Sequence, residues 1–249
     1  MTLTQEQLDF FSENGYLPYG KILNDDEVAT LRAEYDRTFE DAFASGGFNN
    51  LSVKAGADLQ DRQTAPSQML QIMQMCERNL HFRRLLYETR ILDIVQDLIG
   101  PNIMLFHDQA LFKPARTGGP ITWHQDNAYW KCAPANLVSC WLTLDDVVRE
   151  NGAMQVLPGS HRKPVWHDVT DTSILLDSEK YIDTSQAVVV DLPAGGCMFH
   201  HCQTLHSTEP NNTERQRRAY AIHFMPPGTS RLDQMLPVSF SHPMLRMRM

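Results

Sequence analysis

Two residues that can bind a metal, His124 and Asp126, lie two positions apart in the segment Trp123-His124-Gln125-Asp126. On a β-strand, side chains two positions apart leave the same face, so this imidazole and this carboxylate would point to one side. His206, further along the chain, would add a second imidazole from a later strand. The spacing therefore predicts a metal site built from His124, Asp126 and His206.

Two histidines and one carboxylate are the ligand set of non-haem Fe(II) oxygenases, which leaves coordination positions open for a cosubstrate and oxygen. An isolated His-x-Asp pair is weak evidence, because any exposed strand can carry one by chance. The weight of the pair therefore depends on the elements that surround it.

The composition is that of a soluble globular protein with a sizeable core, since 42% of its 249 residues are hydrophobic and 21% are charged. The length allows two small domains or one large all-β domain. A net charge of −8 disfavours a nucleic-acid or membrane-surface partner. The chain has no apolar run of membrane-spanning length and no signal-peptide pattern at its start. The five cysteines include no CxxC pair, so we expect free thiols and a cytoplasmic location.

The first third of the chain has helical patterns. Thr4-Gln5-Glu6-Gln7 is a capping box, and Asn24 to Glu27 resembles a second helix start. A third amphipathic stretch, from Ile91 to Ile99, is stopped by Gly100-Pro101.

The pattern then changes to the alternation of β-strands, first from Val138 to Asp145. Further short strands are expected at Ala187 to Leu192, Gly196 to His201 and Ala219 to Met225. Many short strands bounded by Gly, Pro and Asn indicate a mostly β fold, a sandwich or jelly roll, with flanking helices.

Two long stretches without a clear pattern, Ser45 to Gln68 and His167 to Gln186, are predicted to be irregular. Loops of this length in a compact domain are often lids or binding loops. We therefore expect at least one of them to cover the site.

A linked series of segments runs through nearly the whole chain: Gln7 to Tyr16, Lys113-Pro114, His124 to Asp126, Glu150 to His161, His206-Ser207-Thr208 and Arg217. This series resembles the phytanoyl-CoA dioxygenase-like (PhyH) family of Fe(II)- and 2-oxoglutarate-dependent oxygenases. The resemblance implies a double-stranded β-helix, that is, a cupin-like jelly roll. It also implies one domain over residues 1–249, with a mainly helical flank (1–100), a jelly-roll core (101–226) and a C-terminal extension (227–249).

The same resemblance assigns His124, Asp126 and His206 as the Fe(II) ligands. Arg217 lies eleven positions after His206, the offset of the arginine that binds the far carboxylate of 2-oxoglutarate in this family. A guanidinium suits a carboxylate because it can donate two parallel hydrogen bonds. Thr208 matches a hydroxyl that assists the same carboxylate.

Three more residues match family positions around the cosubstrate: Gln109, Lys113 and Trp141. An alternative to cosubstrate binding for Trp141 is simple packing in the core. Among the neighbouring arginines, Arg215 is interpreted as part of a solvated turn, and Arg218 is a rival of Arg217.

The substrate contacts are less defined, and packing at the rim is an alternative role for the candidates. These are Gln125, Asn127, Tyr129, Trp130 and His223, the last because it shares strand parity with Arg217. The acidic balance of the chain does not support a coenzyme A thioester, and the presence of Asp126 disfavours halogenation.

The remaining histidines are not predicted as ligands. His161 lies in a Pro-Gly-Ser-His turn, where a structural hydrogen bond is expected. His200 and His201 are adjacent, so strand alternation would aim one of them inward.

We therefore expect a dioxygenase that uses Fe(II), 2-oxoglutarate and O2 to hydroxylate a small-molecule metabolite, with release of succinate and CO2. Desaturation, epimerisation or cyclisation with the same cofactors is an alternative. A non-catalytic metal- or ligand-binding jelly roll is an alternative of another class. The oligomeric state stays open.

Overall fold

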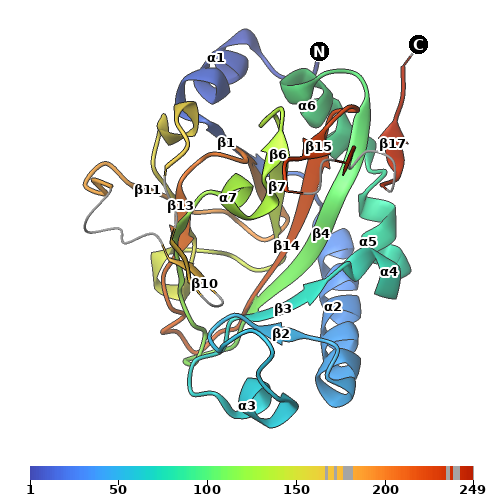
Figure 1. The fold of residues 1–249 in the computed structure, drawn as a ribbon. Helices are drawn as coiled ribbons and strands as arrows, with labels where there is room; N and C mark the ends of the chain where they lie inside the picture. The colour runs from blue at the N-terminus through green and yellow to red at the C-terminus, as the bar shows by residue number, and fades with distance from the viewer. Residues whose placement is uncertain (166–167, 171–172, 176–181, 234–235, 238–241, 249) are drawn as a thin grey trace.

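The computed structural model describes residues 1–165, 168–170, 173–175, 182–233, 236–237 and 242–248. The strands of its larger sheet are β1 (Tyr16–Lys21), β2 (Asn49–Asn50), β3 (Leu70–Met73), β4 (Ile103–Lys113), β7 (Val138–Thr143), β12 (Gly196–His201), β14 (Arg217–Met225) and β17 (Met244–Arg246). Their order is β1-β12-β7-β14-β4-β3-β2, with β17 beside β4, and neighbours are antiparallel (Figure 1).

The strands of the smaller sheet are β5 (Ile121–His124), β8 (Met154–Val156), β11 (Val188–Val190) and β13 (His206–Thr208), in the order β11-β8-β13-β5. Short additional strands are β9 (Asp168–Thr170), β10 (Ser173–Leu175), β6 (Cys132–Ala133), β15 (Ser230–Arg231) and β16 (Leu236–Pro237). β9 pairs with β10, and β15 pairs with both β6 and β16.

An apolar layer lies between the two main sheets. It joins Trp141, Met198 and Ala219 of the larger sheet to Met154 and Val156 of the smaller one. Two antiparallel sheets packed in this way form the predicted jelly roll, so the expected fold class is confirmed.

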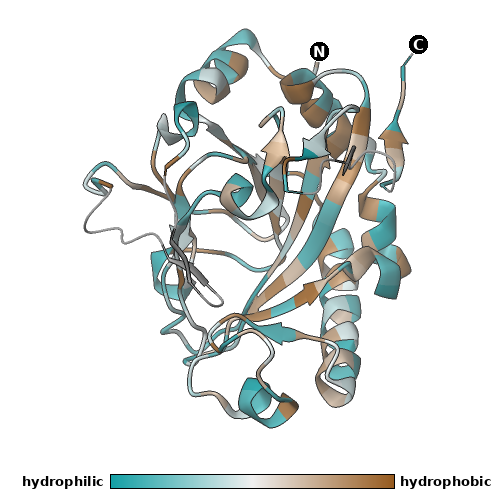
Figure 2. Ribbon diagram, in the orientation of Figure 1, coloured by the Kyte–Doolittle hydropathy of each residue, from teal (hydrophilic) through white to brown (hydrophobic). Residues whose placement is uncertain are grey.

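The helices are α1 (Gln5–Asn14), α2 (Asp25–Ser45), α3 (Leu59–Thr64), α4 (Met75–Arg78), α5 (Leu80–Leu85), α6 (Thr89–Ile99) and α7 (Asp126–Trp130). Apolar side chains of α2, α5 and α6 pack against the face of the larger sheet that carries Tyr220 and Phe224. Figure 2 shows how strongly apolar α6 is. None of the helices in the described residues combines the length and apolar character needed to cross a bilayer.

The predicted helix starts are confirmed. The hydroxyl of Thr4 accepts a hydrogen bond from Gln7 N, and the side chain of Gln7 accepts one from Thr4 N. Asn24 and Glu27 make the same reciprocal pair before α2. α6 ends before Gly100, as predicted.

Two expectations about irregular stretches of the chain need correction. The stretch Ser45 to Gln68 is not irregular throughout, because it contains β2 and α3. In His167 to Gln186, residues 167, 171–172 and 176–181 lie outside the described residues, and the rest includes the β9–β10 hairpin. The flank 1–100 is mainly helical, and it also contributes β1, β2 and β3 to the larger sheet. The extension 227–249 contributes β17.

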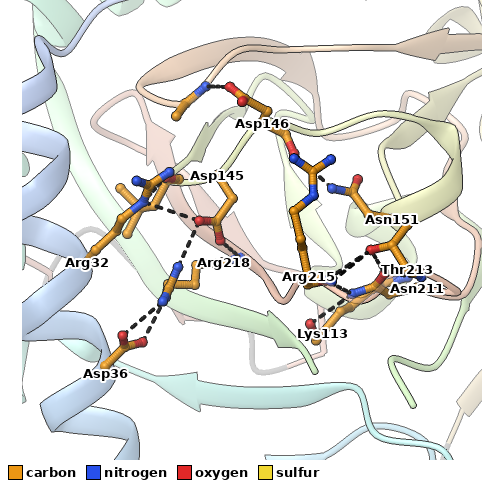
Figure 3. Close-up of polar contacts among 12 residues, drawn as sticks. Arg32, Asp36, Lys113, Asp145, Asp146, Asn151, Asn211, Thr213, Arg215 and Arg218 are labelled. Carbon is orange, nitrogen blue, oxygen red and sulfur yellow. Dashed lines mark hydrogen bonds and ion pairs between the residues drawn. The ribbon is translucent and has the colours of Figure 1, made fainter. Parts of the chain in front are cut away.

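A cluster of ion pairs attaches α2 to the larger sheet (Figure 3). The guanidinium of Arg218 donates to both carboxylate oxygens of Asp36 on α2, at 2.7 and 2.9 Å. It also donates to Asp145, just after β7, at 2.8 Å. Arg32 on α2 lies 3.2 Å from the same Asp145 carboxylate. The cluster therefore aligns α2 with β7 and β14, which carry part of the inner face.

Candidate functional site

The three predicted metal ligands come together. His206 on β13 lies directly opposite His124 on β5, and Asp126 follows at the start of α7. One candidate ligand atom from each residue lies within 4.8 Å of the other two. The Nε2 atoms of His124 and His206 are 3.7 and 3.8 Å from Asp126 Oδ1.

The route by which Asp126 reaches the site differs from the prediction. β5 ends at His124, and the chain enters α7 at Asp126. Gln125 between them is still extended, so the two side chains reach the same site as predicted. The turn between them is held by Gln125, whose amide donates to the carbonyls of Lys163 and Gln203 and accepts from Val165 N.

Both histidines present a free Nε2 lone pair. The Nδ1 of His124 lies 2.8 Å from the Thr122 carbonyl, and that of His206 lies 2.9 Å from the Thr204 carbonyl. A carbonyl can only accept, so each Nδ1 carries the proton and donates it. Such hydrogen bonds orient metal-binding imidazoles in other proteins.

The charge state of the three residues also suits a metal ion. Burial lowers the pKa of His206 to about 3 and lowers the pKa of His124, so both rings are neutral at pH 7. Burial alone would raise the pKa of Asp126, but His206 and His200 outweigh it and hold that pKa below its ordinary value. Two neutral imidazoles and a carboxylate fit a divalent ion, with Fe(II) favoured by their composition.

Two buried basic side chains, which are cations when protonated, lie on the same inner face. Arg217 on β14 is directly opposite Lys113 on β4, and the two side chains are 1% and 0% exposed. Burial, followed by repulsion from Arg217, lowers the pKa of Lys113 to about 6. Burial also lowers the pKa of Arg217 to about 10. The Arg217 guanidinium lies 5.7 Å from the ring centre of Trp141.

Two buried polar atoms near these cations have no hydrogen-bond partner among the described residues, Arg217 Nε and Thr208 Oγ1. Lys113 Nζ donates to the carbonyl of Glu209, the residue after Thr208, so the lysine reaches the end of β13. Buried polar groups are nearly always paired in folded proteins. Unpaired donors beside two cations fit the carboxylate of an anionic ligand.

The other predicted site residues divide into two groups. Gln109, Trp130 and His223 lie together on the inner face. Gln109 Nε2 donates to His223 Nε2 at 3.0 Å, and the rings of Trp130 and His223 are 4.8 Å apart. Tyr129 is 42% exposed, and its ring lies 5.8 Å from that of His124. Asn127, by contrast, bonds the backbone of Cys132 and supports the turn after α7, as Gln125 supports the turn before it.

The rival residues take structural positions. Arg215 is exposed, and Arg218 is held by Asp36 and Asp145. The ring of His161 lies 3.2 Å from the Ser12 carbonyl, which agrees with the structural role expected for it.

Sequence reasoning missed part of the surroundings of Asp126. His200 is the inward member of its pair, with Nε2 3.2 Å from Asp126 Oδ2, and Ser139 Oγ donates to the same oxygen at 3.4 Å. The signal for Ser139 was its strand parity with Trp141. The orientation of His200 required the pairing of β12 with β7, which local sequence does not reveal.

Comparisons with known proteins found similar sequences and similar structures. The family model described as Phytanoyl-CoA dioxygenase (PhyH) matches residues 11–219. The chain is 30% identical over 233 residues to the peroxisomal phytanoyl-CoA dioxygenase of Mus musculus, covering 89% of this chain and 68% of that protein. It resembles EvdO2 from Micromonospora carbonacea, solved with 2-oxoglutarate, at a TM-score of 0.68 and 28% identity over 96% of each chain.

The epimerase SnoN, solved with Fe3+, alpha ketoglutarate and nogalamycin RO, superposes with a TM-score of 0.73 at 24% identity. The match covers 91% of this chain and 85% of that one. At this identity the likeness concerns the fold.

Proposed function

Because the chain belongs to the phytanoyl-CoA dioxygenase (PhyH) family, we propose that it hydroxylates a small-molecule metabolite at the site around His124, Asp126 and His206. It is an Fe(II)- and 2-oxoglutarate-dependent dioxygenase. When bound, iron and 2-oxoglutarate supply the oxidation of a substrate C–H bond by O2, with release of succinate and CO2.

The observation that carries the site assignment is the combination of a His-Asp-His cluster with two buried basic residues, Arg217 and Lys113. Both groups donate to backbone carbonyls, but neither pairs with a carboxylate of the described residues. Burying two such basic groups is costly, so a module that bound only a metal would gain nothing from this pair. We assign Arg217, Lys113 and Thr208 to the far carboxylate of 2-oxoglutarate.

The remaining residues of the inner face line the space between the His-Asp-His cluster and the Arg217–Lys113 pair. Ala219 and Ala221 lie between Arg217 and His223 on the same face of β14, and their small side chains leave room for the cosubstrate. Trp141, opposite Ala221, closes one wall and excludes water. Tyr129, Trp130 and His223 are proposed to contact the substrate, and Gln109 the cosubstrate.

We also propose that residues 1–249 act as one catalytic domain. Strands before residue 100 and the terminal strand β17 complete the same sheet, and α2 is tied to that sheet through Arg218. The cytoplasmic location stays a prediction, supported by five free cysteines and testable by cell fractionation. The mouse relative is described as peroxisomal, so fractionation should include peroxisomes.

The test is a screen of metabolites for substrate-stimulated succinate formation, with Fe(II), 2-oxoglutarate and O2 supplied. Mass spectrometry of the product then separates the chemical outcomes. Hydroxylation adds one oxygen atom, desaturation or cyclisation removes two hydrogens, and epimerisation leaves the mass unchanged. Succinate release without substrate supports an enzyme. Bound iron without any succinate release would favour a binding module.

A further inference from the structure

The two carboxylate oxygens of Asp126 have different surroundings. Oδ1 faces the Nε2 atoms of His124 and His206, at 3.7 and 3.8 Å. Oδ2 instead receives the Ser139 hydroxyl at 3.4 Å and lies 3.2 Å from His200 Nε2. One oxygen is therefore directed to the proposed metal position, and the other is held by the protein.

The two groups on Oδ2 arrive from neighbouring strands. Ser139 on β7 lies directly opposite His200 on β12, so both side chains leave the same face of the larger sheet at the same level. Both are buried, at 0% and 2% exposure. Strand register thus brings both groups to a single carboxylate oxygen.

Behind Ser139, a chain of side-chain hydrogen bonds crosses the sheet. His223 Nδ1 lies 2.7 Å from Ser139 Oγ, and Gln109 Nε2 donates to His223 Nε2 at 3.0 Å. Gln71 donates to Gln109 Oε1, and Asn49 donates to Gln71 Oε1 at 3.0 Å. Five strands, from β2 at the edge to β7, each contribute one residue.

Every donor in this chain points toward Asp126. A glutamine amide nitrogen can only donate, so His223 Nε2 accepts from Gln109 and its proton is on Nδ1. His223 Nδ1 therefore donates to Ser139 Oγ. The Ser139 hydroxyl in turn donates its proton to Asp126 Oδ2. Hydrogen bonds aligned in this way polarise one another, and their dipoles favour the negative charge of the carboxylate.

We propose that Ser139, supported by His223, is a positioning residue that holds Asp126 so that a single carboxylate oxygen faces the metal. This inference rests on the proposed metal site. Removing a residue that hydrogen-bonds a metal ligand commonly lowers the metal affinity by about 10–100-fold. Ser139→Ala should therefore weaken Fe(II) binding by roughly tenfold.

The experiment measures the Fe(II) dissociation constant anaerobically and the visible spectrum of the Co(II)-substituted protein, without substrate. Thr143→Val is the matched control, because Thr143 is buried on the same face of β7 but donates to the Pro193 and Gly196 carbonyls. Weakened Fe(II) binding and an altered Co(II) spectrum in Ser139→Ala, with both readouts unchanged in Thr143→Val, would support the proposal. Unchanged binding in Ser139→Ala, or equal losses in the two variants, would overturn it.

Two substitutions at His223 test the direction in which the hydrogen bonds of this series are donated. His223→Asn places an amide near the position of Nδ1 and keeps a donor for Ser139. His223→Gln places it near Nε2 and removes that donor. Fe(II) affinity should be higher in His223→Asn than in His223→Gln, and equal losses would exclude the role of His223. Asp126→Ala separates this inference from the site itself: if it leaves Fe(II) binding intact, the proposed metal site is wrong.

Discussion

Arg217 and Lys113 lie directly opposite each other in the β14–β4 ladder, with both side chains buried. Burial and repulsion from Arg217 lower the pKa of Lys113 to about 6, so the lysine of the free protein is mostly neutral at pH 7. An anion between them would relieve this repulsion and pair the unbonded Nε of Arg217. We therefore expect a bound dicarboxylate such as 2-oxoglutarate to favour the protonated form of Lys113.

Removing the arginine should weaken cosubstrate binding. Loss of a buried, hydrogen-bonded charge partner costs about 2–5 kcal/mol, which is roughly 30-fold to several thousand-fold in affinity. Arg217→Ala should raise the Michaelis constant for 2-oxoglutarate by such a factor, with Fe(II) affinity near normal. Arg217→Lys should be intermediate, because it keeps the charge but loses the bidentate geometry.

Arg215→Ala is the control, since Arg215 is exposed two residues away. It should leave the Michaelis constant unchanged. Normal 2-oxoglutarate affinity in Arg217→Ala would refute the assignment.

Because of Lys113, the free energy of unfolding of the cosubstrate-free protein should increase as the pH rises. Its pKa is about 6 in the folded protein, against an ordinary value of 10.5. Between these values the unfolded chain binds more protons, so the free energy of unfolding increases with pH through this window. Lys113→Met should lack this contribution and be more stable than wild type at pH 7, while binding 2-oxoglutarate more weakly.

Urea unfolding between pH 6.5 and 9.5, without 2-oxoglutarate, measures the slope for both proteins. Identical slopes for wild type and Lys113→Met would show that Lys113 is charged in the folded protein throughout.

The features that could be predicted from the sequence are those whose interacting residues lie close together in the chain or belong to one motif series. The capping boxes at Thr4 and Asn24 were found because their partners lie three residues away. Gly196 to His201 was predicted with the bounds that β12 has in the structure. The motif series located the ligand cluster because all three residues belong to it.

The missed features depend on long-range pairing. β1 contains Pro18 and Gly20, two residue types that are rare in strands, so its sequence does not predict a strand. Its partner β12 lies far away in the sequence. His124 and Asp126 reach one site as predicted, but the prediction missed the turn at Gln125 that takes the chain from β5 into α7. That turn depends on Lys163 and Gln203, which no local pattern connects to it.

The proposed metal ligands can be tested one at a time. His124→Ala, Asp126→Ala and His206→Ala should each abolish turnover and remove or greatly weaken the binding of one Fe(II) per chain. Their circular dichroism and melting behaviour should stay close to wild type in the absence of metal. His161→Ala is a suitable control, because its ring contacts the Ser12 carbonyl instead of the cluster. Full activity in any ligand variant would remove that residue from the site.

Arg218 should contribute to stability without any role in cosubstrate binding, although it is adjacent to Arg217. Its side chain is 11% exposed and pairs with Asp145 and Asp36, which are 15% and 42% exposed (Figure 3). Removing one partner of a buried ion pair costs about 3–5 kcal/mol, and the exposure of Asp36 reduces this to about 1–3 kcal/mol.

Arg218→Met should therefore lower the free energy of unfolding in urea by that amount, while the 2-oxoglutarate affinity of the folded enzyme stays near normal. Arg116→Met is the matched control, because Arg116 pairs with Glu214 at the surface and both side chains are about 70% exposed. That change should cost less than about 0.5 kcal/mol. A steep loss of 2-oxoglutarate affinity in Arg218→Met, with unfolding unchanged, would mean that the register of β14 is shifted by one residue and that Arg218 faces the pocket.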